Sequence, residues 1–166
     1  MNRHFVEDHL TLAEEGCYLF GSRVNIKKDI LPDLFGKKLL HFGFLSSGIK
    51  KRGRTLRIPF LMTGAKKVDH RSSKLRGCNM SFWRKDFIAV NGFNEGLTGW
   101  GQDDSELIER LHNLGVQGKR LKYGGIAYHI YHKEQNKDHV AHNFEIENNT
   151  KAQKLTFIEK GVNQYL

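Results

Sequence analysis

The sequence predicts an α/β fold in a single domain that covers residues 1–166. Two observations support this prediction. Apolar residues between 104 and 114 recur at helical spacing. Residues 17–26 and 126–131 instead combine β-branched, aromatic and aliphatic side chains between turn-forming residues, as strands do.

The N-terminal part of the chain is predicted to form one helix and one strand. Residues 5–15 have an amphipathic pattern, and Gly16 is a typical residue at a helix end. Residues 17–26 follow as the first strand.

A second strand and a short helix are predicted in the middle of the chain. Residues 76–83 place polar side chains, among them Asn79, between apolar ones, and residues 84–90 form the helix. Asn91 and Gly92 end this helix, because both tolerate the left-handed conformation.

The long amphipathic helix is predicted to begin at Asp103. Asp103 fits the N-cap position, and Glu106 three residues later completes a capping box. Asp104 is then the first helical residue, and it shares a face with apolar side chains that lie three and four positions further on. The apolar stripe consists of Leu107, Ile108, Leu111 and Leu114.

Two strands and a C-terminal extension complete the prediction. Gly115 ends the long helix, and residues 117–122 and 126–131 form short strands. Residues 143–166 are a polar extension that becomes helical from about Asn149.

Composition and charge limit the function classes. The formal net charge of +9 favours anionic partners such as nucleotide phosphates or an anionic membrane surface. No nucleic-acid-binding motif is present. Residues 1–10 do not resemble a signal peptide, and two cysteines are too few for a disulfide framework. We therefore expect a cytoplasmic location.

Residues 37–74 form a distinct basic segment. It contains eleven Lys or Arg residues against the single acid Asp69, with aliphatic and phenylalanine side chains between them. One interpretation is a basic amphipathic insertion that lies on the inner face of an anionic membrane. The other is a solvated, poorly ordered loop.

The strongest chemical signal is the stretch from Gly99 to Asp104. Trp100 stands between two glycines, which let the backbone approach a ligand closely, and its ring is suited to stacking on a sugar. Asp104, facing inward at a helix start, is a candidate general base. The alternatives are that both aspartates only cap the helix and that Trp100 only anchors the core.

Three motifs together resemble the C-terminal, acceptor-side half of inverting GT-A glycosyltransferases. They are Gly-Cys-Asn-Met-Ser-Phe-Trp-Arg-Lys-Asp-Phe at 77–87, Val-Asn-Gly-Phe-Asn at 90–94, and Gly-Trp-Gly-Gln-Asp-Asp-Ser-Glu at 99–106. Bacterial family-2 enzymes, chondroitin polymerase and the β-1,4-galactosyltransferases are the most similar families. The galactosyltransferases have Trp-Gly-Gly-Glu-Asp-Asp-Asp at the third motif, so Gln102 and Ser105 depart from their pattern. The resemblance spans about residues 5–135.

The resemblance implies a partial GT-A fold, with a mixed sheet and flanking helices. It implies transfer of a hexose or amino-hexose from a nucleotide-diphosphate sugar to a saccharide or lipid-linked saccharide, as in polysaccharide biosynthesis, with inversion. Asp104 would be the catalytic base. The implied substrate-binding residues are Trp100, Gly101, Asp103, Gly77 and Asn79, although Asn79 also fits a buried hydrogen-bond partner.

The same resemblance implies a divalent metal. His132 matches a histidine that binds Mn²⁺ in galactosyltransferases, and His129 is the second candidate, although strand alternation would place the two on opposite faces unless the strand has ended. Each also fits an ordinary polar strand residue. The chain has no Asp-x-Asp motif. We therefore expect it to lack the N-terminal nucleotide-binding half and to be inactive alone.

A different class of function also fits the sequence. The same half-fold could serve as a non-catalytic module that binds a sugar or a membrane surface.

Overall fold

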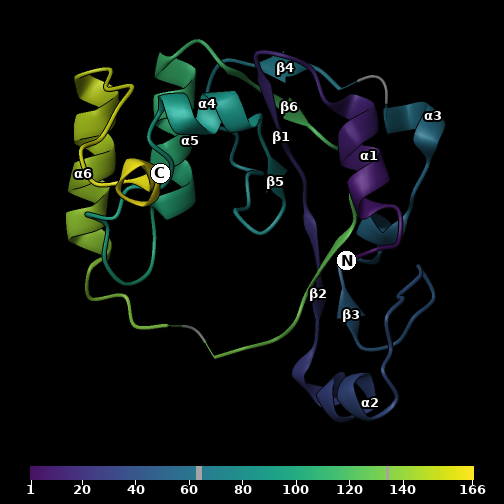
Figure 1. Cartoon of the computed structure of the whole chain (residues 1–166). Helices are drawn as coiled ribbons and strands as arrows, with labels where there is room; N and C mark the ends of the chain where they lie inside the picture. Colours follow the sequence, from purple (N-terminus) through teal and green to yellow (C-terminus); the bar gives the residue numbers. More distant parts are fainter. Residues whose placement is uncertain (63–64, 134) are drawn as a thin grey trace.

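The computed structural model describes residues 1–62, 65–133 and 135–166 (Figure 1). It confirms the α/β class. Within these ranges there is a four-stranded sheet in the order β4-β6-β1-β5 and a three-stranded sheet in the order β3-β2-β7, with both parallel and antiparallel pairs. The strands are β1 (Cys17–Phe20), β2 (Arg23–Ile26), β3 (Ile49–Lys50), β4 (Lys67–Val68), β5 (Met80–Ser81), β6 (Gln117–Arg120) and β7 (Ala127–His129).

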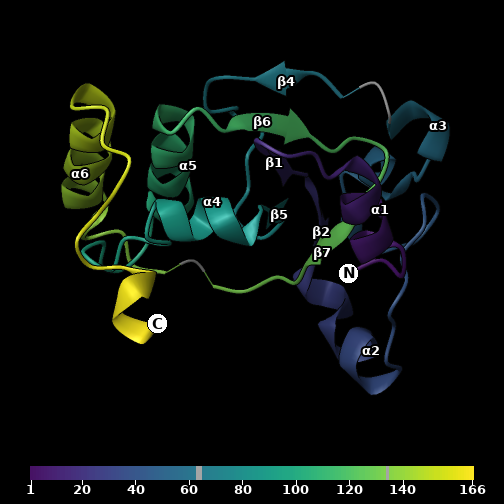
Figure 2. The ribbon, with the colours of Figure 1, turned by 45° about the horizontal axis from the view of Figure 1, so that its top comes forward.

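The helices form two groups beside these strands. Figures 1 and 2 show α4, α5 and α6 together on one side of the strands and α1 and α3 on the other. No helix in the described ranges is both long and apolar enough to cross a bilayer. The α-helices are α1 (Phe5–Leu12), α2 (Leu31–Gly36), α3 (Pro59–Met62), α4 (Arg84–Ala89), α5 (Asp103–Asn113) and α6 (Val140–Ala152), and 3₁₀-helices cover Lys28–Ile30, Arg52–Thr55 and Val162–Tyr165.

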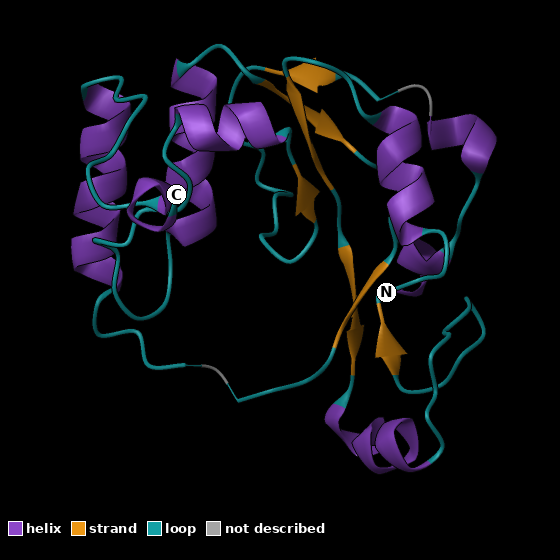
Figure 3. Cartoon of the chain, viewed as in Figure 1, coloured by secondary structure: helices purple, strands orange, loops and turns teal. Residues whose placement is uncertain are grey.

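The predicted strand over 17–26 is two strands that belong to different sheets. β1 pairs in parallel with β6, and β2 pairs in parallel with β7, so two neighbouring chain segments pass together from one sheet to the other (Figure 3). The break falls at Gly21 and Ser22 in one segment and at 121–126 in the other.

Asn79 fastens the two segments at this break. Its side-chain nitrogen donates to the backbone carbonyl oxygens of Ser22 at 2.8 Å and Gly125 at 2.7 Å. Its backbone carbonyl oxygen accepts a hydrogen bond from the Gly21 N–H at 2.8 Å. A Cβ on Gly21 would lie 2.4 Å from the Asn79 side-chain nitrogen, so only glycine fits there. Asn79 is completely buried, and we assign it a structural role in place of substrate binding.

The Asn79 network also fixes the protonation of His9 on α1. The Asn79 nitrogen donates to two carbonyls, so its Oδ1 must accept from His9 Nε2 at 3.1 Å. His9 Nδ1 then accepts from the Ser81 hydroxyl at 2.7 Å. Burial lowers the pKa of His9, against the Asn79 hydrogen bond and the Asp8 charge, which raise it. His9 is thus held as the neutral imidazole.

This arrangement predicts a pH dependence of stability. A folded-state pKa below the ordinary value of about 6.5 means that His9 contributes stability above that pH and loses it as the pH falls through the folded pKa. Urea unfolding between about pH 7.5 and pH 5 should therefore show a weaker pH dependence in His9→Gln than in the wild type. His41→Gln, which changes an exposed histidine, should keep the wild-type profile. Parallel profiles for wild type and His9→Gln would contradict the assignment.

Helix α5 is buried on the predicted apolar face, but its start differs from the prediction. Leu107, Ile108 and Leu111 have no exposed surface. The N-cap is Gln102, in the left-handed conformation, and no side chain caps the helix. The predicted capping box is wrong because the Glu106 carboxylate pairs with the Arg110 guanidinium one turn later.

The end of α5 and the segments that follow it also differ from the prediction. Leu114 is 42% exposed, beyond the buried stripe. The C-terminal helix begins at Val140 and not near Asn149. Its packing face carries buried polar side chains, so apolar periodicity could not reveal it. These side chains are Asn143, Glu147 and Thr150.

The basic segment 37–74 contributes to both sheets. β3 pairs with β2, and β4 pairs with β6. Phe42, Ile49 and Met62 are buried, whereas Leu40 and Leu45 are largely exposed. Residues 63–64 lie outside the described residues. Attachment of this segment to an anionic membrane stays a prediction.

The remaining element boundaries are shorter than expected. Helix α1 ends at Leu12, before Gly16. The strand predicted over 76–83 is reduced to β5, because the Asn79 N–H bonds to the Arg76 carbonyl at 2.9 Å and turns the chain. This turn exposes Gly77 beside the start of α5.

Candidate functional site

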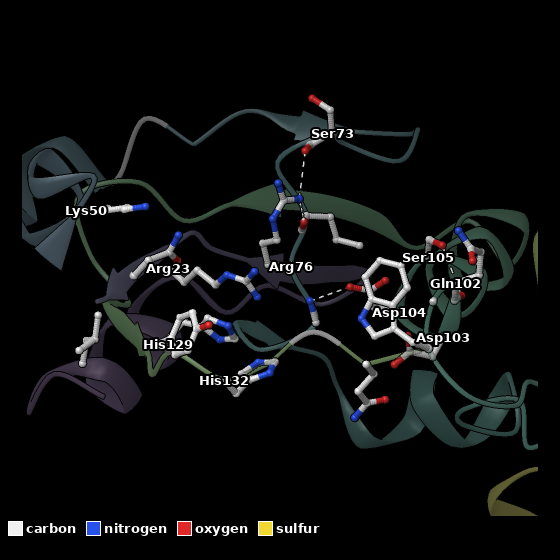
Figure 4. A pocket seen from close by; sticks show the side chains of 18 of the residues that line it. Arg23, Lys50, Ser73, Arg76, Gln102, Asp103, Asp104, Ser105, His129 and His132 are labelled. Atoms are coloured by element: carbon white, nitrogen blue, oxygen red, sulfur yellow. Dashed lines mark hydrogen bonds between the residues drawn. The ribbon is translucent and has the colours of Figure 1, made fainter. Parts of the chain in front are cut away.

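A cavity of about 1200 Å³ lies between the β2–β7 edge and the start of α5. The residues of the Gly99–Ser105 stretch that line it are Trp100, Gly101, Gln102, Asp103, Asp104 and Ser105. In Figure 4 the two aspartates lie toward one end of the cavity, and Arg23, His129 and His132 lie toward the other. Residues from distant parts of the chain therefore share one solvent-accessible space.

Asp104 is held in the cavity by one backbone donor. The Gly77 N–H donates to Asp104 Oδ2 at 2.7 Å. A Cβ on Gly77 would stand 3.0 Å from that oxygen, so the glycine allows the close approach. The other carboxylate oxygen of Asp104 has no hydrogen-bond partner among the described residues. Asp104 therefore has a fixed orientation and one oxygen available to a ligand.

Asp103 is the more exposed of the two carboxylates, and it lines the same cavity. It is the first residue of α5 and not its cap. The positive end of the helix dipole stabilises negative charge on both aspartates. Since Asp103 makes no capping bond, its carboxylate can accept hydrogen bonds from a ligand.

Trp100 lies on the surface of the cavity and not in the core. It is 48% exposed, and the Lys137 ammonium lies 5.2 Å from its ring centroid. The glycines on both sides are left-handed, with φ of +71° at Gly99 and +106° at Gly101, and Gln102 follows at +69°. This backbone presents the ring to solvent. The alternative of a core anchor is therefore excluded.

Asn143 of α6 fixes the Trp100 loop. Its side-chain nitrogen donates to the carbonyl oxygens of Thr98 and Gly101, both at 2.9 Å, and the residue is almost fully buried. Sequence reasoning missed this contact, because its partners lie more than forty residues away and Asn143 belongs to no motif.

The cavity lining has a large excess of positive charge. Against Asp103 and Asp104 it holds seven cationic side chains, which favour an anionic ligand. They are Arg23, Lys27, Lys28, Lys50, Arg71, Arg76 and Lys133. Arg23 and Arg76 were not singled out in the sequence. The sequence did contain one indication that these arginines lack a local ion-pair partner: neither has an acidic residue within four positions.

Both candidate metal ligands line the cavity. β7 ends at His129, so strand alternation does not extend to His132, and the two rings pack edge to face with centroids 5.0 Å apart. Burial lowers the pKa of His129, and the charges of Arg23 and His132 lower it further.

The residues described here do not by themselves fit a divalent cation. Among residues 1–62, 65–133 and 135–166, no group of three or more His, Cys, Asp or Glu side chains is arranged to bind a metal. Mn²⁺ requires more ligands than two imidazoles, including carboxylate oxygens. A metal role for His129 and His132 stays a prediction.

Comparison with known proteins adds an independent observation. Residues 59–133 match the family described as the N-terminal domain of galactosyltransferase. The matched range covers less than half of the chain, and it supports a similarity to galactosyltransferase-like glycosyltransferases. No curated protein and no solved structure matches the chain. The family description refers to an N-terminal domain, so our placement of the chain in a C-terminal half stays a prediction.

The galactosyltransferase-like segment supplies only part of the cavity. Gly77, Asp104 and His132 lie within residues 59–133. Arg23 and Lys50 precede the segment, and the Asn143 clamp on the Trp100 loop follows it. The cavity is thus completed by residues outside the matched family region.

Proposed function

We propose that this protein is an inverting glycosyltransferase that transfers a hexose or amino-hexose from a nucleotide-diphosphate sugar to a saccharide hydroxyl. The observation that carries the proposal is the Asp104 carboxylate, which lines a strongly basic cavity, is fixed by the Gly77 N–H, and has no hydrogen-bond partner for its other oxygen among the described residues. The galactosyltransferase-like segment at residues 59–133 supports the reaction class.

In this proposal the carboxylate end of the cavity binds the acceptor. The exposed ring of Trp100 stacks on the acceptor sugar, and Asp103 accepts a hydrogen bond from one of its hydroxyls. Asp104 takes the proton of the attacking hydroxyl, because it is a carboxylate already oriented at a helix start. Asn143 maintains the position of Trp100.

The basic end of the cavity binds the donor. The acceptor oxygen forms a bond to the anomeric carbon as the bond from that carbon to the diphosphate oxygen breaks. The electron pair leaves on the diphosphate, and the nearby cations, Arg23 and Arg76 among them, stabilise that charge. Attack on the face opposite the leaving group inverts the anomeric configuration.

Acceptor-dependent release of nucleoside diphosphate tests this function. The intact protein, with any segments that flank residues 1–166, is incubated with a panel of nucleotide sugars and saccharides, and the anomeric configuration of the product is read by NMR. We expect release that requires the acceptor and a product with inverted configuration. Saccharide binding with no transfer from any donor would favour a non-catalytic sugar-binding module. A product with retained configuration would contradict the role of Asp104.

A further inference from the structure

Three arginines beside the cavity carry positive charge that the protein does not neutralise. Arg23 belongs to β2, Arg54 to the 3₁₀-helix Arg52–Thr55, and Arg76 to the turn before β5. We call them the arginine cluster. None of the three forms an ion pair in the part of the chain that the structure describes.

The members of the cluster repel one another. Burial lowers the pKa of Arg54, and the charges of Arg76, Arg120 and Arg23 lower it further. The pKa of Lys51 is lowered chiefly by Arg54. Arg54 also donates to the Arg23 backbone carbonyl at 2.9 Å, which fixes the two segments together. The fold therefore maintains a repulsion that a bound anion would relieve.

Three other arginines of the chain do form ion pairs with carboxylates. Arg57 pairs with the buried Asp8 at 2.7 Å, and Arg110 pairs with Glu106. At the cavity itself, Arg71 is held by Glu147 at 2.9 Å. The cluster therefore differs from these arginines in having no carboxylate partner and in placing Arg23 and Arg76 in the cavity lining.

The hydrogen bonds of the cluster leave donors for a ligand. Arg23 uses Nη1 in a long contact of 3.9 Å to the Cys78 sulfur, and Arg76 uses Nη1 for the Ser73 carbonyl at 3.2 Å. Their other guanidinium nitrogens have no partner among the described residues. Guanidinium groups bind phosphate oxygens through paired N–H donors.

The surroundings favour direct phosphate binding over a bridging metal. Arg23 belongs to β2, which pairs with β7, the strand that ends at His129, and the Arg23, His129 and His132 side chains all line the cavity. A divalent cation there would be repelled by Arg23 and would find no carboxylate group arranged with the histidines in the described residues. A diphosphate is instead attracted by the same charge.

We propose that Arg23 and Arg76, supported by Arg54, bind the diphosphate group of a substrate directly and without a bridging divalent cation. The expected source is the nucleotide-sugar donor, and this identity rests on the proposed function. A lipid-linked diphosphate carries the same chemical group. The direct contact itself depends only on the arginine cluster and the charge of the cavity.

Calorimetric titration of the full-length protein with inorganic pyrophosphate tests the contact. Titrations are run with EDTA and again with Mn²⁺, at low ionic strength because salt screens the attraction. We expect binding in EDTA. Arg23→Gln and Arg76→Gln should each weaken it about 10–100-fold, the usual effect of losing a charge-assisted hydrogen bond. Arg76→Lys should retain part of the affinity.

Arg84→Gln is the matched control, because it removes the same charge from an exposed arginine that does not line the cavity. Its affinity for pyrophosphate should stay close to that of the wild type, and thermal melts establish that each variant is folded. An equal loss of pyrophosphate affinity in Arg84→Gln and in the cluster variants would overturn the proposal. Binding that requires Mn²⁺ would overturn it as well.

Competition separates the two sources of the diphosphate. Stronger displacement of pyrophosphate by nucleoside diphosphates than by geranyl diphosphate supports the donor as the ligand, and the reverse supports a lipid-linked substrate. Either result supports the arginine contact. Pyrophosphate binding by the cluster in a protein that transfers no sugar would leave this contact established and would refute only the proposed function.

Discussion

Asp104→Asn should lower kcat of the full-length protein about 10²–10⁴-fold, the contribution expected of a general base. The amide cannot take the proton of the acceptor hydroxyl. Its oxygen can still accept the Gly77 N–H, which donates to Asp104 at 2.7 Å, so the fold should be preserved. Steady-state kinetics with saturating donor and acceptor measures the loss, and a thermal melt checks the fold.

Asp103→Asn is the matched comparison, because Asp103 is the neighbouring carboxylate of the same cavity. Since its proposed role is to bind the acceptor, the change should raise the acceptor KM more than it lowers kcat. Near-normal kcat in a folded Asp104→Asn protein would remove Asp104 as the base. A large kcat loss confined to Asp103→Asn would exchange the two roles.

Among the variants proposed for this protein, Arg110→Met should produce the largest loss of folding stability. Arg110 and Glu106 have no exposed surface and make hydrogen bonds of 2.8–3.1 Å, and Arg110 also donates to the Val90 carbonyl. Removing one partner of a buried pair typically costs about 3–5 kcal/mol, because the other charge stays buried. For a chain of this size, Tm should fall on the order of 10 °C.

Two further variants separate the ion pair from simple loss of packing. Arg110→Met combined with Glu106→Leu removes both charges and should be less damaging than Arg110→Met alone. Lys37→Met breaks the exposed Asp33–Lys37 pair, which has the same spacing along a helix, and should leave Tm nearly unchanged. If the double variant melts below Arg110→Met, the loss does not arise from an unpaired Glu106.

The sequence predicted features that depend on local pattern. The buried face of α5 follows from the spacing of Leu107, Ile108 and Leu111. The end of α4 follows from Asn91 and Gly92, which adopt φ of +63° and +69°.

Features that depend on contacts across the chain were missed. Glu106 and Arg110 have the spacing of a solvated surface pair, but they are buried where α6 and the end of α4 contact α5. Helix α6 itself was placed too late, because its buried residues are polar. The break at Gly21 depends on Asn79, which lies 58 positions away.

The candidate site divides in the same way. A contiguous motif was enough to bring Trp100, Asp103 and Asp104 to one cavity. Arg23 and Arg76 also line that cavity, but they lie more than fifty positions apart in the sequence. No local sequence pattern therefore indicated that they share a site. Asn79 was expected to be either a substrate-binding residue or a buried hydrogen-bond partner, and its side chain bonds to His9 and to the carbonyls of Ser22 and Gly125.

A structure of the protein with a nucleoside diphosphate and an acceptor saccharide bound tests the central claim most directly. We predict that an acceptor hydroxyl lies about 2.6–3.2 Å from the Asp104 carboxylate, with the sugar ring against Trp100. The diphosphate should contact Arg23 and Arg76. A saccharide bound outside this cavity, or bound in it with every hydroxyl beyond reach of Asp104, would contradict the account.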